Sequence, residues 1–452
     1  MAKTRTMYEC TSCGHTEPKW LGRCPACGTW NSFIQSTAEG SSPGKKTPGK
    51  KASPLVPLAS ITTAENPRIS TGMAELDRTL GGGIVPGSSV LIGGEPGIGK
   101  STLMIQLACG FRRDAPVLYI SGEESAHQVK ARADRLGISG GSVDIFCETD
   151  IDAIQKALDK RNPLMVIVDS IQTLRSEELG TVAGTVNQIK YCTHELISWV
   201  RERGSAVFLV AHVTKEGTIA GPKVVEHMVD TVLYFEQTGS EIRLIRSAKN
   251  RFGSIDEIGL FTMNETGLHQ VTDPSALFTV QRDGPLPPGI TVAAVYEGSR
   301  SLLVEIQALV VPAKGGISRV FSDKIDSRRV SRIAAVLEKH LSLSFADRDI
   351  YVNVAGGIRL DETGIDLPLA FALYSARTDL PVPDNTVFAG EISLAGEIRS
   401  VGHIDRRFKA FNDAGKGMFL GPPLRGTGFK SDTGYKAAAS IREGIGRVFK
   451  KP

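Results

Sequence analysis

Between residues 90 and 235, short apolar runs alternate with segments whose apolar positions recur at helical spacing. The apolar runs have the length of buried strands and lie at 90–92, 117–120, 163–168 and 206–211. The helix-length segments lie at 102–108, 126–136 and 186–203. Apolar strands separated by helices are typical of a mainly parallel sheet covered by helices. The pattern predicts an α/β fold, in which residues 231–235 and 241–246 form a pair of antiparallel edge strands.

The chain changes character near Asp273 and Pro274, and prolines at 285, 287 and 288 interrupt it soon afterwards. Further strand-like and helix-like segments follow at 290–296, 302–311, 331–341, 350–354 and 367–376. We therefore expect a second α/β domain over residues 273–452.

Residues 36–57 are rich in Ser, Gly, Pro, Lys and Thr, a composition typical of a flexible linker. This linker separates a cysteine-containing segment, residues 1–35, from the first α/β domain, residues 58–272. The net charge of +4 permits nucleic-acid binding without indicating it. No apolar run is long enough to span a membrane and the N-terminus lacks an apolar signal core, so we expect a cytoplasmic protein with no membrane partner.

The clearest motif follows the first apolar run, where residues 94–101 fit the P-loop pattern G-x-x-x-x-G-K-S. Glycines let backbone N–H groups wrap a phosphate, and the N-terminus of the following helix adds partial positive charge. Lys100 can reach the β- and γ-phosphates of ATP, and the Ser101 hydroxyl can ligate Mg²⁺. The predicted nucleotide contacts are Gly94, Glu95, Pro96, Gly97, Ile98, Gly99, Lys100, Ser101 and Thr102.

Polar residues end three of the other predicted strands. Asp169 follows a strongly apolar run, the Walker B arrangement, and its carboxylate would hold the Mg²⁺ shell. Glu123 is the candidate that orients or deprotonates the attacking water, with its neighbour Glu124 as the alternative. His212 is a candidate contact to the γ-phosphate. Carboxyl ends of parallel strands share one edge of a sheet, so we expect these residues near the P-loop.

Two C-x-x-C knuckles occupy the N-terminal segment, formed by Cys10 and Cys13 and by Cys24 and Cys27. Each knuckle can place two thiolates on one tetrahedral metal ion. Four thiolates leave no open position, so we predict a structural Zn²⁺ site of the ribbon type. Trp20 and Trp30 can stack on bases, but we expect them to cover the small metal-bound core.

The P-loop segment resembles the RecA-like superfamily, and the whole chain resembles the bacterial RadA (Sms) family of DNA-repair proteins. Three segments carry the second resemblance: the cysteine knuckle at 8–14, the P-loop at 94–101, and Lys-Asn-Arg-Phe-Gly at 249–253. It implies an ATP-driven ring motor that binds single-stranded and branched DNA. It also implies that the motor works beside the RecA recombinase and promotes branch migration of recombination intermediates.

Lys249 and Arg251 belong to the last of these segments, and in an extended chain both project from one face. In related ring-shaped helicases a similar Lys-x-Arg pair reaches the nucleotide of the adjacent subunit. The resemblance therefore implies a closed homo-oligomeric ring, a hexamer, in which both residues act catalytically across an interface, as an arginine finger does.

The second α/β domain resembles the proteolytic domain of Lon protease, most clearly over residues 387–399. Pro368 aligns with the nucleophilic serine of that family and Asp405 with its activating lysine. Neither residue can replace its counterpart, so we expect a scaffold without peptidase activity. Two other functions remain as alternatives, an ATP-dependent protease and a regulatory ATPase like the clock protein KaiC.

Overall fold

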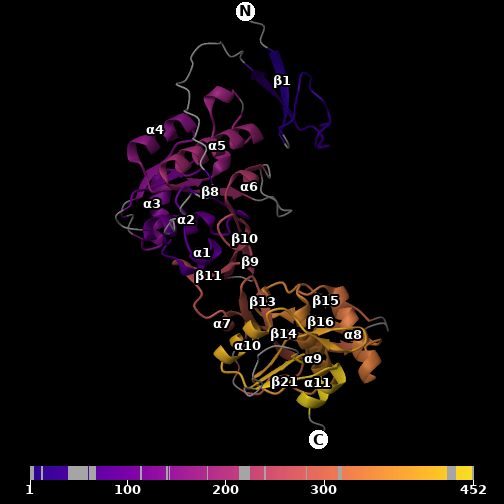
Figure 1. The fold of residues 1–452 in the computed structure, drawn as a ribbon. Coiled ribbons are helices and arrows are strands. Elements are labelled where there is room, and N and C mark those ends of the chain that lie inside the picture. The colour runs from indigo at the N-terminus through magenta and orange to yellow at the C-terminus, as the bar shows by residue number, and fades with distance from the viewer. Residues whose placement is uncertain are drawn as a thin grey trace, which may run out of the picture. The chain divides into compact units, whose positions relative to one another are not determined.

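The computed structural model describes residues 5–11, 14–38, 57, 60, 68–111, 115–138, 141, 143–180, 182–212, 224–238, 241–280, 282, 284–313, 318–424 and 434–449 (Figure 1). The chain divides into two compact units. The first comprises Met1–Glu236 and Arg243–Gln270, and the second comprises Gln237–Ile242 and Val271–Pro452. Among the helices that the structure describes, none combines the length and the apolar character needed to cross a membrane.

In the first unit, the described strands form a nine-stranded sheet in the order β12-β11-β10-β9-β4-β8-β7-β5-β6. Their bounds are β4 (Ser89–Gly94), β5 (Val117–Ser121), β6 (Val143–Phe146), β7 (Met165–Asp169), β8 (Ala206–His212), β9 (Thr231–Thr238), β10 (Ile242–Asn250), β11 (Ile258–Asn264) and β12 (Gly267–Gln270). From β9 to β6 all neighbouring strands run parallel. The predicted α/β fold is confirmed.

One detail of the predicted sheet is wrong. We expected residues 231–235 and 241–246 to form the edge of the sheet, but β9 and β10 lie inside it. The sheet continues beyond them through the antiparallel pair β11 and β12. Both strands are largely buried, and sequence alone does not separate an edge strand from an inner strand that borders a hairpin.

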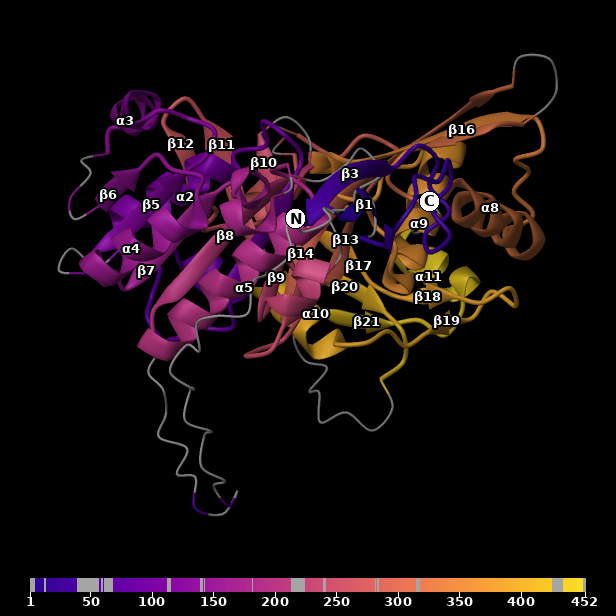
Figure 2. The ribbon, with the colours of Figure 1, turned by 90° about the horizontal axis from the view of Figure 1, so that it is seen from above.

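The helices of the first unit cover both faces of this sheet (Figure 2). They are α1 (Ala74–Thr79), α2 (Lys100–Gly110), α3 (Ala126–Arg135), α4 (Ile151–Arg161), α5 (Val186–Arg203) and α6 (Val224–Met228). Alternation along β4 separates the two cores, because Val90 and Ile92 pack with residues of α2 and α3 while Leu91 packs with residues of α4 and α5. Caps define the helix ends: Ser125 and Gln128 form a capping box at the start of α3.

The second unit contains a mixed seven-stranded sheet in the order β15-β16-β14-β13-β17-β20-β21. Its strands are β13 (Ile290–Glu297), β14 (Arg300–Pro312), β15 (Val320–Ser322), β16 (Arg348–Val354), β17 (Thr386–Phe388), β20 (Met418–Gly421) and β21 (Tyr435–Ala437). The helices are α7 (Ser275–Phe278), α8 (Ser327–Leu341), α9 (Asp366–Thr378), α10 (Ile404–Asp413) and α11 (Ile441–Val448). A small separate ladder joins β18 (Glu391–Ile392) to β19 (Ile398–Arg399).

The N-terminal segment is a three-stranded antiparallel ribbon with β1 (Arg5–Cys10) between β2 (Thr16–Glu17) and β3 (Phe33–Ala38). Its small buried core contains Cys10, Cys24 and Phe33. Most of the predicted linker at 36–57 lies outside the described residues.

Candidate functional site

The P-loop lies between the end of β4 at Gly94 and the start of α2 at Lys100. Gly99 precedes the helix in a left-handed conformation with φ +115°, which a side chain would strain. A Cβ on Gly94 would lie 2.8 Å from the Phe235 carbonyl oxygen, so that position requires glycine. A Cβ on Gly97 would meet no atom within 4 Å, so the tip of the loop is open. The loop thus has the bare, accessible backbone that a phosphate requires.

Lys100 is 4% exposed and folds back over this loop. Its Nζ donates hydrogen bonds to the carbonyl oxygens of Gly94 at 2.7 Å and Glu95 at 2.9 Å. Burial lowers the pKa of the ammonium group, and the carboxylates of Asp169, Glu123 and Glu95 oppose that shift. The ammonium therefore lies within the electrostatic reach of the predicted Walker B and water-activating carboxylates.

The parallel register brings the predicted strand-end residues to the same edge of the sheet. Gly94 at the end of β4 is opposite His212 at the end of β8. In the strands beyond β8, Ser121 at the end of β5 is opposite Asp169 at the end of β7. Only β8 separates the P-loop strand from the Walker B strand. This edge can bind a triphosphate and a divalent cation side by side.

Asp169 is held by a residue that the sequence analysis did not select. The hydroxyl of Tyr119, a buried residue of β5, donates a hydrogen bond of 2.7 Å to Asp169 Oδ2. Burial and the adjacent carboxylate raise the pKa of Tyr119 well above its ordinary value, so the phenol remains a donor. A signal was present, because a tyrosine in an otherwise aliphatic buried strand needs a partner for its hydroxyl.

The two adjacent glutamates have different surroundings. Ser170 Oγ donates a hydrogen bond of 2.5 Å to Glu123 Oε1, and His212 Nε2 lies 3.3 Å from the same oxygen. Glu124 instead forms an ion pair with Arg132 of α3. Glu123 therefore faces the phosphate edge, whereas Glu124 is tied to a helix.

In the ribbon, Cys10, Cys24 and Cys27 bring their sulfur atoms within 4.8 Å of one another. Cys10 Sγ and Cys27 Sγ are 3.6 Å apart, near the roughly 3.8 Å expected of two thiolates on one tetrahedral Zn²⁺ with Zn–S bonds of about 2.3 Å. Both knuckles close with the same turn, in which Gly14 N donates to Cys10 O and Gly28 N donates to Cys24 O. The all-sulfur donor set fits zinc; Cys13, the fourth predicted ligand, lies outside the described residues.

The expected role of the two ribbon tryptophans is wrong. Trp20 is 51% exposed and Trp30 is 69% exposed, so neither covers the metal-bound core. Phe33 and the cysteines themselves form that core. A module of this size buries too little apolar surface to enclose two indole rings.

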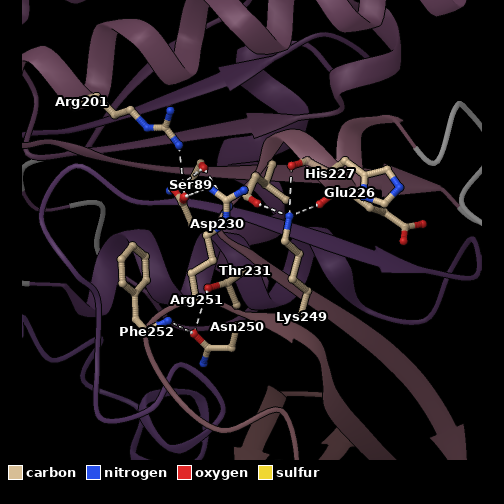
Figure 3. A network of polar contacts seen from close by, with 11 residues as sticks. Ser89, Arg201, Glu226, His227, Asp230, Thr231, Lys249, Asn250, Arg251 and Phe252 are labelled. Atoms are coloured by element: carbon tan, nitrogen blue, oxygen red, sulfur yellow. Dashed lines mark hydrogen bonds and ion pairs between the residues drawn. The ribbon is translucent and has the colours of Figure 1, made fainter.

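Lys249 and Arg251 lie away from the P-loop, near Ser89 at the start of β4. Figure 3 shows the polar contacts of the two cations. Lys249 Nζ donates to the carbonyl oxygens of Glu226, His227 and Val229 at the end of α6. Burial, and then the neighbouring Arg251, lower the pKa of Lys249.

Arg251 Nη1 lies 3.2 Å from Oδ1 of the buried Asp230. The other carboxylate oxygen of Asp230 accepts hydrogen bonds from N and Oγ of Ser89, the first residue of β4. Both cations are thus attached to the segment just before β9, and strand β4 separates them from their own P-loop.

In the second unit, the first turn of α9 is buried and, apart from Asp366, apolar. Residues 366–370 read Asp-Leu-Pro-Leu-Ala, without a hydroxyl or thiol, and Pro368 and its two leucine neighbours are buried. Asp405 lies on the exposed side of the first turn of α10.

The strand order, the P-loop and the carboxylates at the strand ends define a RecA-like P-loop ATPase. Comparison with curated proteins identifies the family. The chain is 50% identical to the DNA repair protein RadA of Treponema pallidum over 99% of both chains. It is 42% identical to the RadA of Bacillus subtilis over 98% of this chain and 99% of the relative, and 42% identical to that of Pseudomonas aeruginosa over 93% and 92%. The chain belongs to the RadA family of DNA repair proteins.

Models of protein families match three parts of the chain. A rubredoxin metal binding domain matches residues 8–35, a family of unknown function matches residues 68–251, and subunit ChlI of Mg-chelatase matches residues 322–422. The first match agrees with the cysteine cluster. The chain is thus an ATPase of a DNA repair family that uses ATP, Mg²⁺ and Zn²⁺, with a Lon-like second α/β domain.

Proposed function

We propose that this ATPase is a ring-shaped motor that binds single-stranded and branched DNA and promotes branch migration beside the RecA recombinase. The resemblance in sequence supplies the DNA substrates and the partner. Membership of the RadA family supports a role on DNA. The position of Lys249 and Arg251, far from their own P-loop, supports the ring.

The Lys-x-Arg pair and the P-loop of the same subunit are separated by the length of β4. Ser89 begins β4 beside Asp230 and Arg251, and Gly94 ends β4 at the P-loop. Six residues of strand span roughly 16–20 Å. A side chain anchored at one end of this strand cannot reach a phosphate bound at the other end. If Lys249 and Arg251 act on ATP, they act on the ATP of a neighbouring subunit.

We assign the following roles to the residues of the phosphate edge. Lys100 binds the β- and γ-phosphates once it leaves the carbonyl oxygens of the loop. Glu123 orients and deprotonates the attacking water, and Ser170 and His212 hold its carboxylate. Ser101 and Asp169 would hold Mg²⁺, which neutralises charge on the phosphates when it is bound. Hydroxyl and carboxylate oxygens are ligands that Mg²⁺ prefers.

In the neighbouring subunit, Arg251 and Lys249 would neutralise charge that develops on the γ-phosphoryl group. Such a contribution is worth on the order of 10³-fold or more in rate. Because each site is complete only across an interface, hydrolysis would be coupled to motion between subunits, as a motor requires. We propose a hexamer as the closed ring.

Mixing two inactive variants tests the action across subunits. Lys100→Ala and Arg251→Ala subunits should each be nearly inactive alone. In mixed rings some interfaces pair an intact P-loop with an intact Arg251, so part of the ATPase should return. Failure to recover activity in demonstrably mixed rings, or full activity of Arg251→Ala alone, excludes this arrangement.

The DNA substrate is tested by the ATPase rate with and without single-stranded DNA. Strong stimulation supports the motor over a protease or a KaiC-like regulator.

We also propose the module boundaries at 1–35, 36–57, 58–272 and 273–452, with the last module acting as a scaffold.

A further inference from the structure

The ribbon exposes aromatic and basic side chains that lie close together along the chain. We call this set the ribbon patch, and its members are Lys19, Trp20, Leu21, Arg23 and Trp30. The chain contains three tryptophans, and two of them lie here. The third, Trp199, is buried in α5. Exposed aromatic and arginine side chains are the types enriched at surfaces that bind a partner.

The members of the patch lie on and around the second cysteine knuckle. Arg23 and Trp30 form an antiparallel bridge, and Asn31 N donates a hydrogen bond to the Gly22 carbonyl oxygen beside it. A Cβ on Gly22 would lie 3.9 Å from the ring of Trp20, so Trp20 packs against the same short segment whose next residue, Arg23, pairs with Trp30.

Trp20 and Arg23 are held in place before any partner arrives. Trp20 Nε1 donates a hydrogen bond of 3.1 Å to the Phe33 carbonyl oxygen. Arg23 Nε donates one of 3.0 Å to the Gly28 carbonyl oxygen, which fixes its guanidinium 5.7 Å from the centre of the Trp30 ring. Ligands lose little further side-chain entropy on binding such ordered groups.

The charge of the patch selects the partner. Residues 18–31 contain Lys19 and Arg23 and no aspartate or glutamate. The nearest described carboxylate along the chain, Glu17, is paired with His15. Exposed indoles beside cations are the combination that binds single-stranded nucleic acid, because bases stack on the rings and phosphates contact the cations. Stacked bases within a duplex do not offer their faces.

We infer that the ribbon patch is a second binding site for single-stranded DNA, in which Trp20 and Trp30 stack on bases and Lys19 and Arg23 contact the adjacent phosphates. This inference rests on the proposed function only in that single-stranded DNA is the substrate of the motor. It gives the zinc ribbon a direct role on DNA, independent of the P-loop edge.

The test uses the full zinc-loaded chain, a thymidine oligonucleotide and tryptophan fluorescence. Stacking on thymine should quench the emission of Trp20 and Trp30 and spare that of buried Trp199. Replacing both exposed tryptophans by Phe should abolish the quench and largely retain the affinity. The double variant Trp20→Ala/Trp30→Ala should bind more weakly, by about tenfold for each ring lost. An abasic oligonucleotide of equal length and charge should bind the parent as weakly as this double variant.

Zinc content and ATP turnover without DNA serve as controls, and the Ala variants should match the parent in both. The inference is overturned if saturating oligonucleotide leaves the emission of the parent unchanged, or if the double Ala variant binds as tightly as the parent. Normal stimulation of its ATPase by DNA would then leave the proposed motor intact. Loss of a protein contact without loss of DNA affinity would assign the patch to a protein partner. A parent that neither binds single strands nor is stimulated by them contradicts both proposals.

Discussion

Helices α2 and α9 both begin at a position of functional interest. The P-loop lysine begins α2, and the first turn of α9 contains the residue that aligns with the nucleophilic serine of Lon protease. The two first turns nevertheless have opposite surroundings. The start of α2 is approached by a loop of glycines, with open space beside Gly97 and a buried cation at Lys100. The start of α9 is filled by Leu367, Pro368 and Leu369, all buried. Both helix ends carry the same partial positive charge. What separates them is whether the adjoining backbone is left bare for a ligand or covered by apolar side chains.

The largest effect that this contrast predicts is on Lys100. Lys100→Ala should lower ATP turnover by on the order of 10²–10³-fold or more, because it removes the cation at the phosphates. Circular dichroism should show an unchanged fold. The matched variant Lys409→Ala removes an exposed lysine of α10 and should leave turnover unchanged. Near-normal turnover of Lys100→Ala would show that the start of α2 is not the phosphate-binding site.

A smaller effect is expected at Tyr119. Tyr119→Phe removes the hydroxyl that holds Asp169, and loss of such a supporting group typically costs about tenfold or more in metal affinity. The Mg²⁺ concentration for half-maximal ATPase should therefore rise about tenfold. Tyr191→Phe, in α5, is the control and should leave the Mg²⁺ requirement unchanged. An equal fall in turnover at every Mg²⁺ concentration would show that Tyr119 does not position the metal ligand.

A still smaller effect concerns Asp366, the one charged residue in the first turn of α9. Burial raises its pKa, and the nearby Arg329 and Arg332 oppose that shift. An acid whose folded-state pKa is raised contributes stability that is full below its unfolded pKa and is lost as pH rises through the folded pKa. Asp366→Asn does not titrate, so its stability relative to the parent should increase with pH across that window.

Scanning calorimetry of the full chain from pH 4 to pH 8 measures this difference for the transition of the second unit. A relative gain of about 1 kcal/mol would appear as roughly 2–4 °C in the midpoint of a unit of this size. The exposed Asp361→Asn is the control and should show no such trend. A relative stability of Asp366→Asn that falls as pH rises would contradict the assigned cause.

The last prediction is an effect of zero. The second unit should not cleave unfolded protein substrates, with or without ATP and DNA, since the first turn of α9 offers no nucleophile and Asp405 cannot act as an amine base. Cleavage that copurifies with the protein and disappears on substitution within this unit would contradict this prediction. The start of α9 would then carry chemistry despite its apolar packing.

The sequence predicted the α/β class and the carboxyl-edge placement of Asp169 and His212, because apolar strands and the residues after them are local features. It left Glu123 and Glu124 as alternatives for the residue that activates water. Only the tertiary structure shows that Glu124 pairs with Arg132 and that Glu123 accepts a hydrogen bond from Ser170. Tyr119 was missed for the same reason: its partner lies 50 residues away. The exposure of Trp30 depends on how little core the ribbon can build, which a residue pattern does not report.

The carboxylate of Asp230 has more partners than the role of Arg251 requires. Besides Ser89 and Arg251, its Oδ1 lies 3.1 Å from Arg201 of α5. If Arg251 swings out to a neighbouring subunit, the buried charge keeps Arg201 and Ser89, so the departure leaves no unpaired anion in the interior. The half-exposed guanidinium of Arg251 can therefore leave Asp230 at a small cost in free energy. In the proposed ring, Arg251 would stay bound to Asp230 in a lone subunit and would move to the neighbouring subunit on ring closure, without destabilising the sheet below it.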